Sequence, residues 1–290
     1  MKILKTLLVS LSCAVLLTAC GDDDDNIKYG GDTGGSTQQN VSGATGRIEV
    51  PALKSGNVFV SHWTVENGDS TMSYCFEYDG TKQHTRWVAY RFDGVTRAQN
   101  TSRTDAWADD PSLPSSMQIG KEYFDGYQRG HICPSADRVY SEAANQQTFY
   151  MSNMSPMSGD FNTGIWSKLE TLVRNKGHKK EFADTLYVVK GGTIDNSSYI
   201  LKYINRPNGK KVPVPKYFYT ALVRVKNGTY TGIAFLLEHR SYSESEAQNL
   251  SKYALTIDEL EEFTGIDFFP NLPDAIERAV ESSYTSSYWF

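Results

Sequence analysis

The chain has 290 residues, of which 39% are hydrophobic and 12% aromatic, so it can bury a sizeable core. This composition excludes a chain that is disordered throughout its length. The formal net charge of −5 also argues against a protein that coats a polyanion through a broad basic surface.

The first residues have the layout of a secretory signal. Lys2 and Lys5 precede an apolar run over residues 7–17, which is short for a membrane span. The following Leu17-Thr18-Ala19-Cys20 resembles the lipobox of bacterial lipoproteins. This resemblance implies a signal peptide over residues 1–19, cleavage before Cys20 and lipid attachment to its thiol. We therefore expect an exported protein that is anchored to the bacterial cell envelope, at the outer membrane. A plain signal peptide with an incidental Cys20 is the alternative.

Residues 20–46 are predicted to form a flexible linker. Four aspartates at positions 22–25 precede a stretch rich in Gly, Thr, Ser, Gln and Asn, which cannot bury enough apolar surface to order itself. The acidic run is either a sorting signal or a solvated spacer. Residues 47–290 show no internal repeat and no second linker, so we predict one α+β domain there. It carries 26 Lys and Arg against 29 Asp and Glu, because three of the 29 basic and five of the 34 acidic residues precede it.

The first half of this domain is predicted to be rich in strands. Runs of β-branched and aromatic residues predict strands at 58–64, 73–78 and 86–92, and a further strand is expected to end near His131. Residues 97–118 are predicted to be a loop, because their prolines disfavour a helix. In the second half, strands are expected at 186–190, 217–226 and 229–237, the last two joined by a tight turn at Asn227-Gly228.

Helices are fewer but carry clear signals. A short helix is predicted at 141–147, and a helical apolar stripe predicts another at 164–175. Thr256 and Glu259 have the spacing of a capping box, and Gly265 is expected to end the helix that they begin. A last helix is predicted at 273–282.

Cys75 and Cys133 are the cysteines of the predicted domain. An exported protein can keep disulfides, but sequence spacing does not give the distance that a bridge requires. A Cys75–Cys133 disulfide and two free buried thiols therefore both remain open.

The segment Gln128-Arg129-Gly130-His131 brings a candidate general base and a cation close together. A neutral imidazole can take a proton from water near pH 7, and Arg129 can hold an anion beside it. Taken alone, this motif is a weak signal.

The helix predicted at 164–175 adds a second group of candidates. Glu170 and Arg174 are one turn apart and lie along one edge of its apolar face, and Asn162 lies just before the helix. Oxygen atoms are the ligands that Mg²⁺ prefers, so Asn162 and waters held by Glu170 can form a magnesium site. A simple surface ion pair between Glu170 and Arg174 is the alternative.

Several motifs in order strengthen this hypothesis. Trp87 to Tyr90, Gln128 to His131, Thr148 to Asn153, Phe161-Asn162 with Leu169-Glu170, and Leu260 to Pro270 together resemble the DNA/RNA non-specific endonucleases of the ββα-metal class, which include endonuclease G. The resemblance covers most of residues 47–290. It implies the ββα-metal (His-Me finger) fold, with a central antiparallel sheet, flanking helices and a β hairpin that presents the histidine.

The resemblance also implies roles for single residues. His131 corresponds to the general base that activates water, Asn162 to the metal ligand and Glu170 to the carboxylate that acts on the metal through water. Asn153 corresponds to an asparagine that supports the site. The phosphate-binding arginines correspond to Arg129, Arg174 and Arg103. The implied cofactor is one Mg²⁺ ion, with Mn²⁺ as an alternative, the substrates are DNA and RNA, and the products carry 5′-phosphate ends.

Two positions depart from the family pattern. Gln128 stands where the family commonly has Asp, and Met157 stands where it often has Gln. If the Asp mainly orients neighbouring groups, Gln128 can replace it; if it tunes the metal directly, activity falls. The alternative hypothesis is therefore a catalytically weakened lipoprotein that binds nucleic acid or another component of the envelope.

Overall fold

The computed structural model describes residues 41–120, 124, 126–206 and 209–290. The predicted signal peptide, Cys20 and most of the predicted linker lie outside the described residues. The described domain begins before the predicted boundary at residue 47, because Val41–Thr45 forms helix α1. Ala44 of this helix is fully buried against the domain core, so the last residues of the predicted linker belong to the domain.

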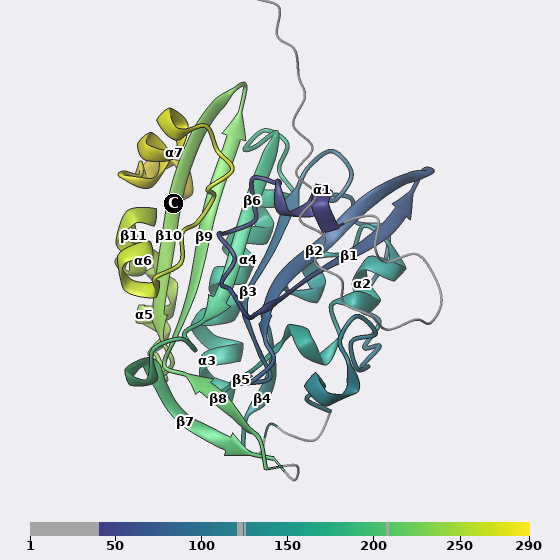
Figure 1. Cartoon of the computed structure of the whole chain (residues 1–290). Coiled ribbons are helices and arrows are strands. Elements are labelled where there is room, and N and C mark those ends of the chain that lie inside the picture. Colours follow the sequence, from purple (N-terminus) through teal and green to yellow (C-terminus); the bar gives the residue numbers. More distant parts are fainter. Residues whose placement is uncertain (1–40, 121–123, 125, 207–208) are drawn as a thin grey trace, which may run out of the picture. The chain divides into compact units, whose positions relative to one another are not determined.

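The centre of the described part is a seven-stranded antiparallel sheet with the strand order β1-β2-β3-β6-β9-β10-β11. This arrangement confirms the predicted α+β class with a central antiparallel sheet (Figure 1). The strands of this sheet are β1 (Val58–Glu66), β2 (Asp69–Asp79), β3 (His84–Phe92), β6 (Thr185–Gly192), β9 (Tyr217–Lys226), β10 (Thr229–Glu238) and β11 (Ala254–Leu255).

The predicted hairpin between β9 and β10 is confirmed. Lys226 pairs with Thr229 across a two-residue turn, in which Asn227 and Gly228 have φ angles of 48° and 74°. Asn and Gly tolerate this left-handed conformation at low cost, which is why the pair turns the chain so tightly.

Two further pairs of strands lie outside the main sheet. They are β4 (Gln128–His131) with β5 (Met154–Met157), and β7 (Ile200–Asn205) with β8 (Lys211–Pro215). Strand β4 was predicted, whereas β5, β7, β8 and the short β11 were not. Prolines at positions 156, 213 and 215 weaken the strand signal, and such residues are tolerated where a strand has one open edge.

The described helices are α1, α2 (Glu142–Gln147), α3 (Gly159–Phe161), α4 (Ser167–Gly177), α5 (Glu244–Gln248), α6 (Ile257–Thr264), α7 (Asp274–Glu281) and α8 (Ser286–Trp289). The predicted helices at 141–147 and 273–282 correspond to α2 and α7. The predicted capping box is present at α6, where Thr256 and Glu259 exchange hydrogen bonds, and Gly265 ends the helix with a φ angle of 67°. The predicted loop at 97–118 contains one short 3₁₀ turn, η1 (Ser115–Met117).

The main sheet is buried on both faces. Successive side chains of a strand point to opposite sides, so one strand contributes residues to two cores. On β3, Val88, Tyr90 and Phe92 face a core that contains the apolar side of α4, whereas Trp87 and Ala89 face a second core under α6 and α7. We call these the α4 face and the α6–α7 face. Figure 1 shows α6 and α7 beside β10.

The disulfide that the sequence left open is not formed. Cys75 and Cys133 are both free and buried. Cys75 packs in the core of the α6–α7 face and Cys133 in the core of the α4 face. The two thiols are therefore part of the packed interior and do not link the strands to the segment after His131.

Within the described ranges, no helix combines the length and the apolar character needed to cross a lipid bilayer.

Candidate active site

The antiparallel pair β4–β5 positions His131. Gly130 lies opposite Ser155 and His131 opposite Met154. A β-carbon on Gly130 would collide with the Sδ atom of Met157, so a larger residue at this position would require the Met157 side chain to move. Met157 thus fills the space that the missing side chain leaves, and its role is one of packing.

The imidazole of His131 lies in an aromatic setting. Its ring centroid is 5.1 Å from that of Phe149 and 5.6 Å from that of Trp107, and both rings meet it edge to face. The backbone carbonyl of His131 accepts a hydrogen bond of 3.3 Å from Trp166 Nε1. Neither ring nitrogen is hydrogen-bonded to any described residue, and Nε2 is buried. The imidazole is therefore not tied to a protein partner among the described residues.

Burial lowers the pKa of His131 to about 3, and the positive charges of Arg103, Lys190 and Arg129 act in the same direction. The imidazole is consequently neutral at neutral pH and has a lone pair that can accept a proton. A phosphate group bound beside these cations would offset their charge and move the pKa back toward its ordinary value.

Asn153 lies behind His131, outside the pocket that the histidine lines. Its Oδ1 accepts a hydrogen bond from the Cys133 amide at 2.8 Å, and its Nδ2 donates to the carbonyls of Cys133 and Thr148 at 2.9 and 2.8 Å. Its own carbonyl accepts from the Ile132 amide. Asn153 therefore holds the segment after His131 in place.

The opposite wall begins with a wide helical turn, η4 (Asn162–Trp166), which leads into α4. Gly164 leaves the helical conformation there, with φ −92° and ψ −115°. The helix predicted from residue 164 therefore begins as regular α-helix only at Ser167. Turns of this widened type are frequent at functional sites, and here one carries Asn162.

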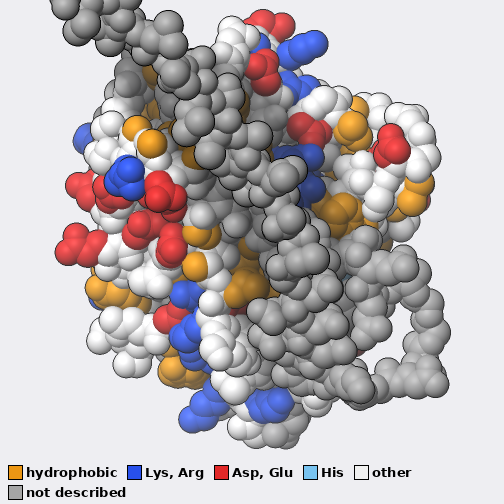
Figure 2. Space-filling view, turned by 45° about the horizontal axis from the view of Figure 1, so that its top comes forward, with side chains coloured by type: hydrophobic (Ala, Val, Ile, Leu, Met, Phe, Trp, Pro, Cys, Tyr) orange, Lys and Arg blue, Asp and Glu red, His pale blue; other side chains and the backbone are white. Residues whose placement is uncertain are grey.

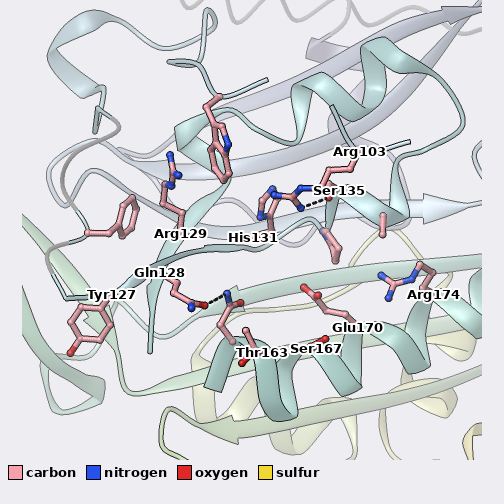
Figure 3. Close-up of a pocket in the computed structure, with 15 residues that line it drawn as sticks. Arg103, Tyr127, Gln128, Arg129, His131, Ser135, Thr163, Ser167, Glu170 and Arg174 are labelled. Atoms are coloured by element: carbon pink, nitrogen blue, oxygen red, sulfur yellow. Dashed lines mark hydrogen bonds between the residues drawn. The ribbon is translucent and has the colours of Figure 1, made fainter. Parts of the chain in front are cut away.

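Gln128 orients the side chain of Asn162. Asn162 Nδ2 donates a hydrogen bond of 2.9 Å to Gln128 Oε1 (Figure 3). This bond uses the nitrogen of the Asn162 amide and leaves its oxygen, which accepts no hydrogen bond from the described residues. Gln128 thus orients a candidate metal ligand. This contact corresponds to the hypothesis that the residue at this position mainly orients neighbouring groups.

Glu170 points from α4 into the same pocket. Its Oε1 is 3.4 Å from Lys190 Nζ, and its Oε2 makes no hydrogen bond to any residue in the described ranges. Lys190 is fully buried on β6, with Nζ 4.2 Å from the ring centroid of Trp166. Burial raises the pKa of Glu170, whereas the charge of Lys190 lowers it. Lys190 therefore favours the ionised carboxylate that a cation site needs.

Three arginines surround this space. The Arg129 guanidinium lies 3.8 Å from the Trp107 ring centroid and forms no ion pair with a described residue. Arg103 donates to Asp105 and to Ser135 Oγ, and lies 4.7 Å from the Phe149 ring centroid. Arg174 Nη1 donates to the buried Asp137 at 3.2 Å.

These side chains line one pocket of about 810 Å³. Figure 3 shows His131 and Arg103 on one wall, facing Glu170 and Arg174 on the other. Among the described residues, Glu170 is the one carboxylate in the lining, so the pocket is positive although the chain is acidic. The lining consists of Arg103, Trp107, Phe124, Tyr127, Gln128, Arg129, His131, Pro134, Ser135, Ala136, Asn162, Thr163, Ser167, Glu170 and Arg174.

The donor set fits a hard cation. The amide oxygen of Asn162 and the Oε2 atom of Glu170 are oxygen donors without hydrogen-bond donors among the described residues, and the pocket has room for several waters. Mg²⁺ favours such oxygen ligands and retains part of its water shell.

Two functional residues were not assigned from the sequence. Lys190 is a charged residue inside the apolar run of β6, and a charge at a position expected to be buried was the sequence feature that could have indicated a functional role. Asp137 binds both Arg174 and the hydroxyl of Tyr90, at 3.2 and 2.7 Å. Asp137 follows the Gln128–His131 motif closely, but its partner lies on another element, so spacing alone did not reveal its role.

Two antiparallel strands followed by a helix, with the histidine on the first strand and the amide at the helix start, define the ββα-metal class of nuclease sites. Comparison with known proteins identifies the family. Residues 55–275 match the family model described as DNA/RNA non-specific endonuclease, and the chain belongs to this family of metal-dependent nucleases.

Individual relatives agree with this assignment. A nuclease of Nostoc is 32% identical over 224 residues, covering 72% of this chain and 75% of that protein. The mitochondrial nuclease of Saccharomyces cerevisiae is 30% identical, covering 70% and 65% of the two chains. The solved structure of the EndoG/EndoGI complex contains a chain that aligns with a TM-score of 0.58 at 20% identity, covering 74% of this chain and 88% of that one, which supports the fold.

The hydrogen bond from Asn162 to Gln128 leads to a prediction. Replacing Gln128 with Ala removes the acceptor and frees the Asn162 amide to rotate, so cleavage should fall by about 10- to 100-fold, as is typical when the group that orients a metal ligand is lost. Gln128→Asp keeps an acceptor and should retain activity at or above the original level. Initial rates of plasmid cleavage at several Mg²⁺ concentrations would measure both effects. An unchanged rate in Gln128→Ala would show that this hydrogen bond has no functional role.

Proposed function

We propose that this protein is a Mg²⁺-dependent, sugar-non-specific endonuclease that hydrolyses phosphodiester bonds in DNA and RNA and leaves 5′-phosphate ends. The observation that carries the proposal is the convergence of three kinds of group on one pocket. An unpaired imidazole, oxygen donors on the opposite wall and three arginines meet there.

Each group has a separate task in phosphodiester hydrolysis. Arg129, Arg103 and Arg174 bind the nonbridging phosphate oxygens and stabilise the negative charge that grows on them in the transition state. His131 accepts the proton of the attacking water, a step that contributes about 10²- to 10⁴-fold in rate. Mg²⁺ held by Asn162 and Glu170 would neutralise charge on the phosphate and on the leaving oxygen.

Supporting residues keep these groups in position. Trp107 stacks on the Arg129 guanidinium, and Asp137 holds Arg174 by an ion pair. Lys190 favours the ionised form of Glu170 by its charge. Preorganisation of this kind lowers the cost of bringing charged groups together during the reaction.

The charge distribution fits a substrate that is bound through its backbone. The arginines of the pocket address phosphates, and phosphate contacts carry no direct sequence information. The net charge of −5 limits binding elsewhere on the surface. The orienting role of Gln128 favours an active enzyme over the weakened binding protein that was the alternative.

Product analysis tests this proposal. A DNA and an RNA oligonucleotide, each labelled at one end, would be cleaved by the purified protein with Mg²⁺ and then treated with phosphatase. We expect internal cleavage of both substrates and 5′-phosphate ends. Products with 3′-phosphate ends, or cleavage of one nucleic acid alone, would contradict the proposed reaction.

We further propose that the protein is exported and attached to the outer membrane by lipid on Cys20, where it acts on nucleic acid outside the cytoplasm. Leu17-Thr18-Ala19-Cys20 supports this proposal. Replacing Cys20 with Ala should move the protein from the membrane fraction to a soluble fraction and abolish labelling with a radioactive fatty acid. Retention of the Cys20→Ala protein in membranes would contradict lipid anchoring at this residue.

A further inference from the structure

The α6–α7 face carries a second group of chemically active side chains. Helices α6 and α7 pack closely on β10 at Gly232, where a β-carbon would lie 2.7 Å from the Val280 carbonyl oxygen and 2.8 Å from Ile257 Cδ1. Val280 and Ile257 are buried in the core of this face. The two helices are therefore fixed against the strand on the side of the sheet opposite the catalytic pocket.

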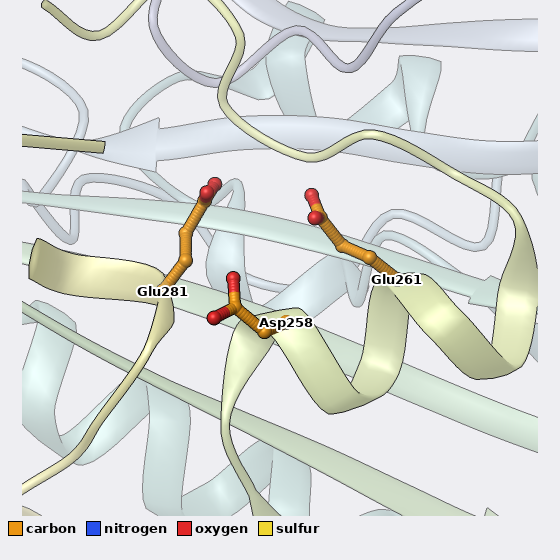
Figure 4. A group of neighbouring side chains, drawn as sticks. All are labelled: Asp258, Glu261 and Glu281. Carbon is orange, nitrogen blue, oxygen red and sulfur yellow. The ribbon is translucent and has the colours of Figure 1, made fainter. Parts of the chain in front are cut away.

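Three carboxylates meet where these helices approach each other. Asp258 and Glu261 lie one turn apart on α6, and Glu281 is the last residue of α7. One carboxylate oxygen of each residue lies within 4.8 Å of the other two. Figure 4 shows the three side chains converging from the two helices.

Glu281 distinguishes this group from an ordinary acidic surface. It is only 6% exposed, and its Oε1 is buried without a hydrogen-bond partner among the described residues. Leaving a buried carboxylate oxygen unpaired is costly unless a cation or a proton compensates it. Glu261 Oε1 accepts the Phe268 amide at 2.6 Å, which fixes this side chain and leaves its other oxygen. Asp258 is exposed and provides access from solvent.

The neighbouring charges do not compensate the cluster. Asp267 and Glu277 add negative charge, and in the described part of the chain no lysine or arginine forms an ion pair with Asp258, Glu261 or Glu281. Burial and the surrounding carboxylates raise the pKa of Glu281 to about 8. Figure 2 shows acidic side chains gathered on this part of the surface.

We propose that Asp258, Glu261 and Glu281 bind a Ca²⁺ ion between α6 and α7. Ca²⁺ takes oxygen ligands at 2.3–2.6 Å in flexible geometry, so two oxygens that share the ion can be up to about 5 Å apart. Mg²⁺ requires near-octahedral ligands at 2.0–2.1 Å and is seldom held by a cage of protein carboxylates alone. The unpaired oxygen of Glu281 would become a ligand, and the exposed Asp258 would complete the site from the solvent side.

The ion would anchor the C-terminal part of the chain. Beyond α7 the chain reaches α8, whose Trp289 packs against Phe182 at a ring distance of 5.4 Å. The carbonyl of Tyr288 accepts a hydrogen bond of 3.0 Å from Lys176 on α4, the helix that carries Glu170. Ca²⁺ binding at the end of α7 would therefore stabilise the folded protein on both sides of the sheet.

Thermal unfolding with and without Ca²⁺ tests this proposal. The protein would be compared with Asp258→Asn, with the double variant Asp258→Asn/Glu281→Gln and with Glu262→Gln, an exposed carboxylate on the same helix that is not in the cluster. At a Ca²⁺ concentration about 100-fold above the Kd, the melting temperature of the original protein and of Glu262→Gln should rise by roughly 5 °C or more. Asp258→Asn should weaken the effect, and the double variant should lose it.

Binding of Ca²⁺ at the catalytic pocket would affect all four proteins equally, so the difference between them isolates the second site. Equal Ca²⁺-dependent shifts in the original protein and the double variant would overturn the proposal, as would no shift in the original protein. An equal shift with Mg²⁺ that is lost in the double variant would overturn the assignment to Ca²⁺. The single variant Asp258→Asn, at an exposed position, provides the comparison if the double variant does not fold.

Discussion

Replacing His131 with Ala is expected to lower phosphodiester cleavage by at least about 10²-fold, which is the usual contribution of a general base. The reason is specific to this pocket. His131 is neutral, and its ring makes no hydrogen bond to a described residue. It is also the one histidine among the described residues that line the pocket, so no other described imidazole there can take the proton of the attacking water. Single-turnover cleavage of supercoiled plasmid at saturating Mg²⁺ would measure the loss.

Chemical rescue provides the control for this variant. Removal of the imidazole leaves space between Phe149 and Trp107, so added imidazole should restore part of the activity of His131→Ala. An unchanged melting temperature would show that the fold is intact. A rate close to that of the original protein would show that the base lies elsewhere.

Replacing Asn162 with Ala is expected to have the second large effect. It removes an oxygen donor of the candidate cation site and also leaves Gln128 without its partner. Because charge stabilisation by a bound metal is worth several kcal/mol, cleavage should fall by about 10²-fold or more, and the Mg²⁺ concentration needed for half-maximal activity should rise. Rates measured over a range of Mg²⁺ concentrations would separate weaker metal binding from slower chemistry.

Asn175→Ala is the matched control for Asn162→Ala. Asn175 is an exposed asparagine on α4 and does not line the pocket. Its replacement should leave both the rate and the Mg²⁺ dependence unchanged. If Asn162→Ala behaves in the same way as this control, the candidate metal site is misplaced.

Local signals explain which parts of the fold could be predicted. The turn at Asn227-Gly228, the capping box at Thr256 and the strands rich in β-branched residues depend on neighbours in sequence, and the structure confirms them. The strands β5 and β8 contain prolines and form only because a partner strand lies beside them. Such pairings are set by tertiary structure and leave little trace in a short window of sequence.

The same distinction applies to the site. Arg129 and His131 are two residues apart on one strand, and Glu170 and Arg174 are one turn apart on a helix. Each pair therefore lies on one face of its element, which could be inferred from spacing. The pairs Glu170–Lys190 and Arg174–Asp137 join different elements, and no spacing rule connects them. The cluster on the α6–α7 face is similar, because Glu281 meets Asp258 and Glu261 only after two helices have packed on the sheet.

We infer that one pocket performs metal-dependent cleavage of both nucleic acids. The most direct measurement is incubation of the purified protein with supercoiled plasmid and with RNA, first with Mg²⁺, then with excess chelator, then with Mg²⁺ restored. The structure and the family predict cleavage of both substrates with Mg²⁺, its loss with chelator and its return on addition of the ion. No cleavage of either substrate, or cleavage that persists in chelator, would contradict the claim.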